Sequence, residues 1–246
     1  MMKTKIALSK YFQGIVPFNN LGLEAAKSDY KWKLPETSFN KKPLDCNGTN
    51  FEATVKLKLM LHEEWKSNPN SRKDIANWIV SKWGGIKTNR KQTLDKYYLS
   101  SLETNPQTSL SGIASFSKIL AIKDPFKYAI YDARVAVSLN AVQMISKVSS
   151  GEVFPYIAGR NNITGNWSSK PPRGFSKNKL TSVKTLVSAP HYWEKVPKET
   201  AYGRYLSLLG TLSKEFGVPL YHLEMALFSQ AEVLACLVIP SLNSNS

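Results

Sequence analysis

The sequence predicts a mainly α-helical protein. In several segments after residue 50, apolar side chains recur at intervals of three and four residues, which places them along one face of a helix. Glycine and proline fall between these segments, where they can end helices. The chain has 246 residues, 42% of them hydrophobic, so it can bury a sizeable core in one large domain or two small ones.

Residues 1–50 are expected to form an N-terminal segment and an irregular arm. Residues 28–50 are polar and include Pro35, Pro43 and Gly48, residue types that favour turns. Residues 51–66 are ambiguous, because their apolar positions fit both the two-residue repeat of a strand and the spacing of a helix. The length of the segment favours a helix, and a helical domain is therefore expected over 51–246.

Apolar stripes predict further helices over 75–83, 94–102, 113–120, 132–148, 205–216 and 223–234. Ser71 is positioned to cap the first of these helices, and Gly84-Gly85 is positioned to end it. The helix at 132–148 carries apolar side chains on two sides, so we expect it to be buried between neighbours.

A long polar segment interrupts the helical pattern after residue 150 and is expected to form a basic loop. Two aromatic residues, Trp167 and Phe175, lie there among the cations Arg160, Lys170, Arg173, Lys177 and Lys179. Interleaved aromatic and basic side chains suit stacking on bases and pairing with phosphates. A mobile basic loop without a ligand fits the composition equally well.

The charge balance indicates a polyanionic partner. The chain has 33 Lys and Arg against 18 Asp and Glu, a net charge of +15 and a pI of about 9.7. Such an excess is most often associated with nucleic acid and less often with an anionic membrane. A solvated basic surface without a partner is the alternative.

Cysteine and histidine are too few and too scattered for the common metal sites. Cys46 and Cys236 are the only cysteines, no CxxC or HExxH occurs, and the three histidines lie far apart. A disulfide scaffold, a cysteine zinc site and a four-cysteine iron–sulfur cluster are therefore excluded, and no cofactor is expected. No apolar run is long enough for a membrane span or a convincing secretory signal, so we expect a cytoplasmic monomer.

Residues 110–140 hold the most informative arrangement of side chains. Gly112 permits a tight turn, and Lys118 lies on the short helix that follows it. The chain breaks at Asp124-Pro125, and Asp132 then stands at the start of the long apolar helix, where the positive helix end favours an ionised carboxylate. On spacing alone, a capping aspartate and a solvated lysine are the commoner outcomes.

The order of these features resembles the helix-hairpin-helix DNA glycosylase superfamily, and most of all its 8-oxoguanine-glycosylase-like branch. The hairpin would comprise residues 110–118, in which LSGIA corresponds to the glycine motif and Lys118 to the family's lysine. Asp132, in YDARV, corresponds to the catalytic aspartate. Three departures stand out: Ala114 replaces a glycine, Lys118 comes about two residues late, and Arg134 replaces a histidine.

The resemblance implies an enzyme that flips a modified base out of double-stranded DNA and excises it, leaving an abasic site. Asp132 would stabilise the positive charge that develops on the deoxyribose. Lys118 would attack the sugar directly, or water would attack in its place, and the displacement of Lys118 favours water. Gly112, Ser115, Ser117 and Arg134 would join the loop cations in contacting DNA. The expected base-pocket residues are Tyr128, Tyr131, Trp167 and Glu224, although Glu224 could instead face solvent.

Some glycosylases resembling this branch defend bacteria by excising modified bases from phage DNA, such as glucosylated hydroxymethylcytosine. The polar loop would accommodate such a base. The alternatives are a repair glycosylase for 8-oxoguanine, a helix-hairpin-helix protein that binds DNA without catalysis, and an RNA-binding protein. Asp132 favours catalysis over binding alone, because a carboxylate near the DNA phosphates would not increase the affinity of a protein that only binds DNA.

Overall fold

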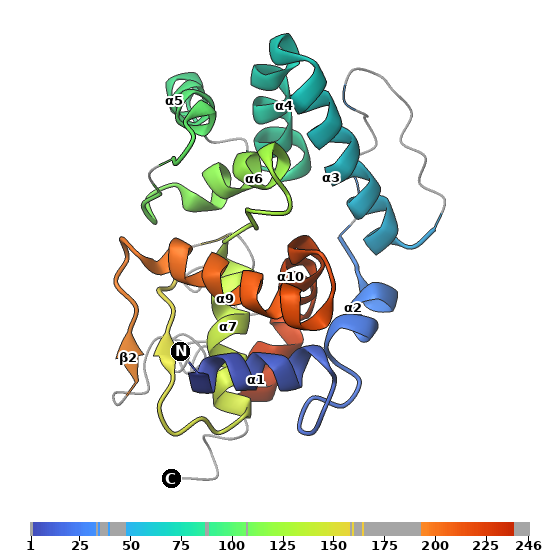
Figure 1. Cartoon of the computed structure of the whole chain (residues 1–246), viewed down its shortest axis with the longest axis vertical. Helices are drawn as coiled ribbons and strands as arrows, with labels where there is room; N and C mark the ends of the chain where they lie inside the picture. Colours follow the sequence, from blue (N-terminus) through green and yellow to red (C-terminus); the bar gives the residue numbers. More distant parts are fainter. Residues whose placement is uncertain are drawn as a thin grey trace.

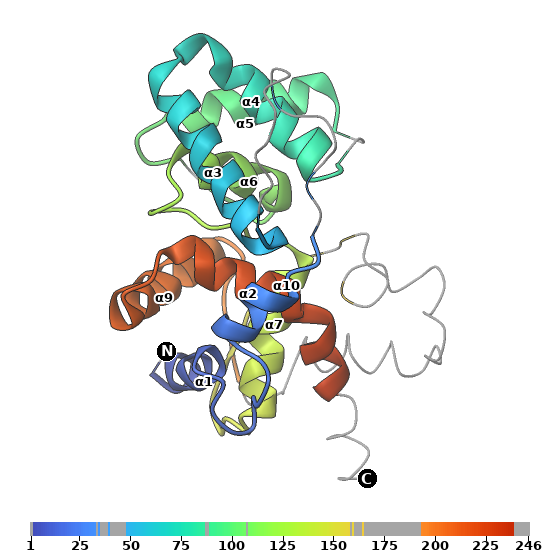
Figure 2. The ribbon, with the colours of Figure 1, turned by 90° about the vertical axis from the view of Figure 1, so that its right-hand side faces the viewer.

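The computed structural model has two helical lobes stacked one above the other (Figures 1 and 2). It describes residues 2–32, 34, 39, 48–86, 89–106, 108–157, 159, 164 and 193–238. Within these residues, the only strands are the short parallel pair β1 (Glu152–Val153) and β2 (Glu194–Lys195). The predicted mainly α-helical class is therefore confirmed.

The upper lobe is built from consecutive helices in the middle of the chain. Its elements are α3 (Asn50–Ser67), the short turn η2 (Pro69–Ser71), α4 (Arg72–Trp78), the π-helical turn η3 (Ile79–Trp83), α5 (Lys91–Leu102) and α6 (Ile113–Lys123). The ambiguous segment after residue 50 is a helix. It begins with a capping box, in which Thr49 accepts from the backbone N–H of Glu52 and the Glu52 carboxylate accepts from that of Thr49.

The lower lobe combines the two ends of the chain. Its helices are α1 (Met2–Phe12), α2 (Leu23–Asp29), α7 (Ala133–Ile145), α9 (Ala201–Phe216) and α10 (Leu220–Val238). The long apolar helix α7 is buried, as its two apolar sides predicted, and packs most extensively against α10. The expected closing helices are both present.

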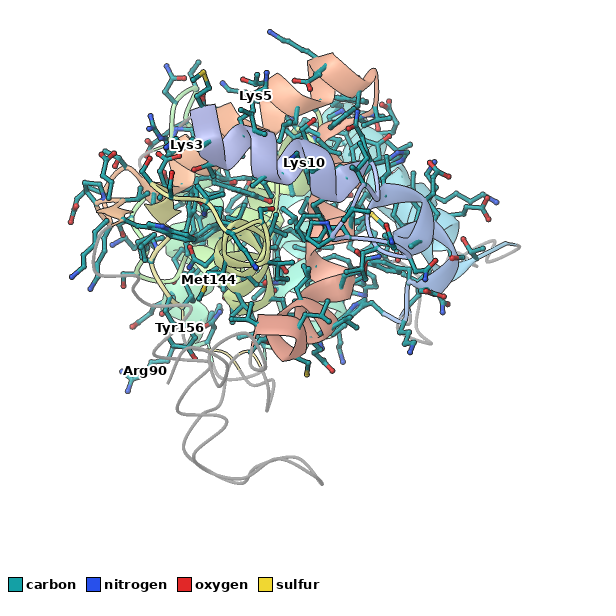
Figure 3. The ribbon with its side chains drawn as sticks, turned by 90° about the horizontal axis from the view of Figure 1, so that it is seen from below. Lys3, Lys5, Lys10, Arg90, Met144 and Tyr156 are labelled. Atoms are coloured by element: carbon teal, nitrogen blue, oxygen red, sulfur yellow. The ribbon has the colours of Figure 1, made fainter. Side chains whose placement is uncertain are left out.

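The N-terminal residues are an integral part of the lower lobe, so the expected boundary at residue 50 does not divide the structure. Leu8, Tyr11 and Phe12 of α1 belong to its core. Tyr11 Oη donates to the carbonyl of Ala226 and to Gln230 Oε1 on α10. The sequence did not predict α1, because its lysines interrupt the apolar pattern. Figure 3 shows three of them, Lys3, Lys5 and Lys10, on this helix.

Ser71 does not cap α4 as predicted. It occupies the N-cap position, but its hydroxyl donates to Glu64 Oε1 at 2.9 Å and makes no capping hydrogen bond. The helix also continues beyond Trp78 as η3, and the N–H of Gly84 donates to the carbonyl of Ile79 where it ends. The expected stop at Gly84-Gly85 is therefore confirmed.

Helix α6 contributes to the cores of both lobes. Ile113, Phe116 and Leu120 pack into the lower core, while Ile119 and Ile122 pack into the upper one. A helix buried on two sides in this way fixes the side chains between those faces, and Lys118 is one of them. The junction of the lobes is therefore the place where α6 positions a buried amine.

Candidate functional site

A cavity of about 50 Å³ lies at the junction of the lobes and contains the titratable side chains that the sequence singled out. Lys118 comes from α6, Asp132 from the start of α7 and Glu224 from α10. The other lining residues are Tyr30, Trp32, Trp83, Gly84, Ile130 and Phe228. The fold thus brings an amine and two carboxylates from distant parts of the chain into one largely aromatic cavity.

Asp132 caps α7 with one carboxylate oxygen and leaves the other available. Oδ1 accepts from the backbone N–H groups of Arg134 at 3.0 Å and Val135 at 3.2 Å. Among the described residues, no group donates a hydrogen bond to Oδ2. The predicted cap is confirmed, and the same geometry places an anionic oxygen at the cavity beside a positive helix end.

Ser117 fixes the backbone that leads to Asp132. Its hydroxyl accepts from the N–H of Tyr131 at 3.0 Å, and its side chain is fully buried. This contact ties α6 to the segment before α7, and therefore sets the position of Lys118 relative to Asp132. Ser117 cannot reach a DNA phosphate from this position, which corrects the sequence-based expectation.

Lys118 is buried rather than solvated. Its Nζ donates to the carbonyl of Ala114 at 2.6 Å, one turn earlier on α6. Burial lowers its pKa, while the charges of Asp132 and Glu224 act in the opposite direction. Gly84 provides space for this side chain, because a Cβ at that position would lie 2.9 Å from Lys118 Cδ.

Glu224 forms an ion pair with Lys58 of α3 inside the protein. Glu224 Oε2 accepts from Lys58 Nζ, and the two side chains are 2% and 1% exposed. Burial raises the pKa of Glu224, and Lys58 opposes that shift. The solvent-facing alternative for Glu224 is therefore wrong. Sequence reasoning missed Lys58, because a lysine on an amphipathic helix gives no sign of a buried partner elsewhere in the chain.

The aromatic walls of the cavity differ from those predicted. Tyr131 packs against Tyr202 and Tyr205, and its hydroxyl donates to the carbonyl of Pro155 at 3.2 Å. Tyr128 is buried in the core of the lower lobe. Neither lines the cavity. Tyr131 lies between the lining residues Ile130 and Asp132 and points the other way, because adjacent side chains on an extended backbone point in opposite directions. Tyr30, Trp32, Trp83 and Phe228 take this place, and Trp32 meets Phe228 edge to face at 5.3 Å.

The other expected DNA contacts have different placements. Gly112 is exposed at the start of α6 and has φ +74°, so the predicted glycine turn is present. Ser115 is buried and accepts from Asn89 Nδ2 at 2.9 Å. Arg134 pairs with Glu232 at 2.7 Å and lies 5.0 Å from the centroid of Phe228. Arg134 thus supports the wall of the cavity and stays partly exposed, Gly112 is exposed, and Ser115 is closed to a ligand.

The loop residues Arg160, Trp167, Lys170, Arg173 and Lys177 lie outside the described residues. In the part of the chain that is described, no helix is long and apolar enough to cross a membrane, and no three His, Cys, Asp or Glu side chains gather as a metal site would require.

Comparisons of the chain with known protein families, with curated proteins and with solved structures found no match. The geometry of the cavity and the resemblance of residues 110–140 are therefore what indicates a function.

Proposed function

We propose that this protein is a DNA glycosylase that flips a modified base out of the duplex and cleaves its N-glycosidic bond, leaving an abasic site. The observation that carries the proposal is the meeting of Lys118, Asp132 and Glu224 in one buried cavity at the junction of the lobes. Burial lowers the pKa of Lys118 and raises that of Glu224, and such perturbed groups sharing a cavity are typical of catalytic sites. The order of the glycine turn, Lys118 and Asp132 also resembles the glycosylase pattern, although Lys118 comes about two residues late.

Asp132 would act on the sugar. Cleavage of the bond to the base generates positive charge on the deoxyribose, and a fixed carboxylate stabilises that charge most strongly where water is excluded. Oδ2 is the oxygen that remains for this purpose, since Oδ1 is held by the helix end. The hydrogen bonds to Oδ1 keep the carboxylate oriented before the reaction begins.

Lys118 would attack the sugar as a neutral amine. The lone pair of Nζ forms a bond to C1′ as the bond from C1′ to the base breaks, and the departing base takes the electron pair of that bond. The new ammonium loses a proton, which Asp132 can accept and pass to the base. Opening of the sugar ring gives an imine, and hydrolysis of the imine releases the abasic site and restores the amine. Its burial and lowered pKa support this route over direct attack by water.

The cavity must enlarge to hold a base, because its volume suits a few water molecules. A second pocket of about 240 Å³ shares Trp32 and Phe228 with it, and these two rings stand between the cavities. Movement of either ring would join them. The outer pocket is lined by the charged side chains of Asp29, Lys31, Arg134 and Glu232. These charged side chains could hydrogen-bond a polar substituent, which supports a base such as glucosylated hydroxymethylcytosine in phage DNA over 8-oxoguanine.

The decisive experiment is incubation of the protein with duplexes that carry glucosylated hydroxymethylcytosine, 8-oxoguanine or unmodified bases. Free base identified by mass spectrometry, together with alkali-sensitive abasic sites, is the expected result for the first substrate. Release of 8-oxoguanine alone would indicate a repair enzyme. Binding without release from any duplex would support the non-catalytic alternative.

Affinity for plain duplex DNA should depend steeply on salt. A net charge of +15 implies that phosphate contacts displace counterions, so the logarithm of the binding constant should fall linearly with the logarithm of the salt concentration. Fluorescence anisotropy over a salt series at constant pH measures the slope. An affinity that is independent of salt would remove nucleic acid as the partner.

A further inference from the structure

The Lys58–Glu224 ion pair lies beside the proposed catalytic amine and is almost completely buried. Lys58 comes from the upper lobe and Glu224 from the lower lobe, so the pair crosses the junction. A buried ion pair is a poor source of stability, since well-packed apolar residues of similar size often do as well or better. Stability therefore gives little reason for its presence at this position.

The charges around Lys118 come from three different elements. Asp132 lies at the start of α7, Glu224 is on α10, and Lys58 is on α3 behind Glu224. Tyr30 also lines the cavity and remains neutral, because burial raises its pKa well above the ordinary value. Without Lys58, the amine of Lys118 would face two carboxylates and no opposing charge, which would stabilise its protonated form.

We propose that the Lys58–Glu224 pair adds to the effect of burial in favouring the neutral, nucleophilic form of Lys118, by cancelling the carboxylate of Glu224 on α10. Lys58 is thus a positioning residue that acts on the reaction through Glu224. The catalytic benefit of this arrangement rests on the proposed glycosylase function. The effect of the ion pair on the pKa of Lys118 can be measured whether or not the protein is a glycosylase. The direction of each interaction is consistent with it: Glu224 raises the pKa of Lys118, and Lys58 lowers it.

Substitutions of the two members of the pair should shift the pKa of Lys118 in opposite directions. Lys58→Met leaves Glu224 without its partner, so the pKa of Lys118 should rise by about one unit or more. Glu224→Gln leaves the charge of Lys58, so the same pKa should fall by a similar amount. The double variant Lys58→Met/Glu224→Gln removes both charges and should return the pKa close to that of the parent protein. Damage to the fold would not produce shifts of opposite sign.

The measurement is an NMR titration of the Lys118 side chain in protein labelled with ¹³C at lysine Cε, in which Lys118→Met assigns the signal. A second readout is the pH dependence of borohydride trapping on DNA, whose acid limb should move with the pKa of Lys118. Glu152→Gln is a matched control, because Glu152 is a buried carboxylate that pairs with Arg204 and does not line the cavity. It should leave the pKa of Lys118 unchanged.

The outcomes separate the inference from the proposed function. Shifts of the same sign in both single variants, or no shift in either, would overturn the inference even if the parent protein releases a base. Opposite shifts in a protein that releases no base would support the electrostatic role and remove the glycosylase. Should Lys58→Met fail to fold, Glu224→Gln and the double variant still decide the question, because a double variant that matches Glu224→Gln shows no effect of Lys58.

Discussion

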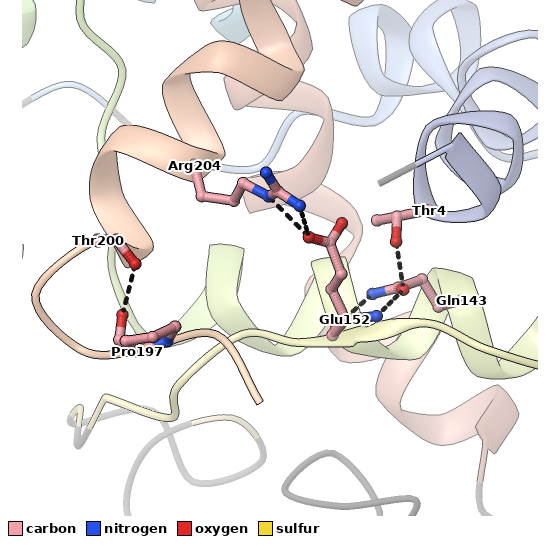
Figure 4. A network of polar contacts seen from close by, with 6 residues as sticks. All are labelled: Thr4, Gln143, Glu152, Pro197, Thr200 and Arg204. Atoms are coloured by element: carbon pink, nitrogen blue, oxygen red, sulfur yellow. Dashed lines mark hydrogen bonds and ion pairs between the residues drawn. The ribbon is translucent and has the colours of Figure 1, made fainter. Parts of the chain in front are cut away.

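The two ends of α7 carry buried polar clusters that differ in how fully their hydrogen-bonding capacity is used. At the C-terminal end, Gln143 Oε1 accepts from Thr4 Oγ1 and from the N–H of Glu152, both at 2.9 Å (Figure 4). Its Nε2 donates to the carbonyls of Leu139 at 3.0 Å and Glu152 at 2.8 Å. With these contacts the Gln143 amide has used most of its hydrogen-bonding capacity. Gln143 therefore joins α1, α7 and β1 and is not available to a ligand.

The N-terminal end of α7 is only partly satisfied. Lys118 uses one donor, on the carbonyl of Ala114, and Asp132 uses one oxygen. These side chains border a cavity, where a substrate can supply the remaining partners. The comparison teaches that burial of polar groups alone does not mark a site. Spare hydrogen-bonding capacity next to a cavity distinguishes the proposed catalytic end of α7 from the end that carries Gln143.

Replacement of Asp132 should give the largest effect. Asp132→Asn keeps the size of the side chain and most of its capping ability, so the free energy of unfolding should change by about 1 kcal/mol or less. Single-turnover base release should slow by about 10³-fold, because the lost charge stabilises the transition state. DNA affinity should be unchanged. Near-normal release by the folded variant would show that this end of α7 is structural too.

Replacement of Lys118 should remove covalent trapping altogether. We expect Lys118→Met to slow base release by about 10²-fold, because water then replaces the amine as nucleophile. Gel analysis after borohydride treatment measures the adduct, and free base is measured in parallel. An unaltered release rate, together with no adduct in the parent protein, would establish attack by water.

Replacement of Gln143 should change stability instead of rate. Gln143→Leu leaves the N–H of Glu152 and the hydroxyl of Thr4 without partners, which should lower the free energy of unfolding by about 2–3 kcal/mol. Urea denaturation measures this change. The folded variant should release base at the parent rate, and a large loss of rate would show that the two ends of α7 do not have separate roles.

Substitutions of the adjacent glycines Gly84 and Gly85 should give the smallest effects, and they compare a position that contacts Lys118 with one that does not. Gly84→Ala places a Cβ 2.9 Å from both Lys118 Cδ and the carbonyl oxygen of Val80, without strain from φ. The amine should move and the rate should fall by about tenfold, in addition to a loss of stability from the backbone contact. A Cβ added by Gly85→Ala would meet no atom within 4 Å, but the φ of Gly85 is +64°. This variant should therefore lower the free energy of unfolding by about 1 kcal/mol and leave the rate unchanged. Equal rates in the two variants would mean that the position of Lys118 does not matter.

Local patterns predicted the elements that surround the site. The cap at Asp132, the turn at Gly112 and the course of α6 all follow from residues near one another in sequence. The partners of those residues could not be predicted, since Lys58 and Glu224 are 166 residues apart. Tyr131 was assigned to the pocket because it precedes Asp132, but the backbone directs its ring into the lower core. Only the fold reveals which aromatic residues from other segments take its place.

Because α6 packs into the cores of both lobes, the two lobes should unfold together. If the lobes were separated, the one that kept α6 would expose an apolar face that the other lobe now covers. Each lobe depends on the other for part of its core, so heating should give a single cooperative transition in place of two. Because the chain crosses between the lobes twice, after α2 and after α6, a single proteolytic cut in one connection would leave them joined.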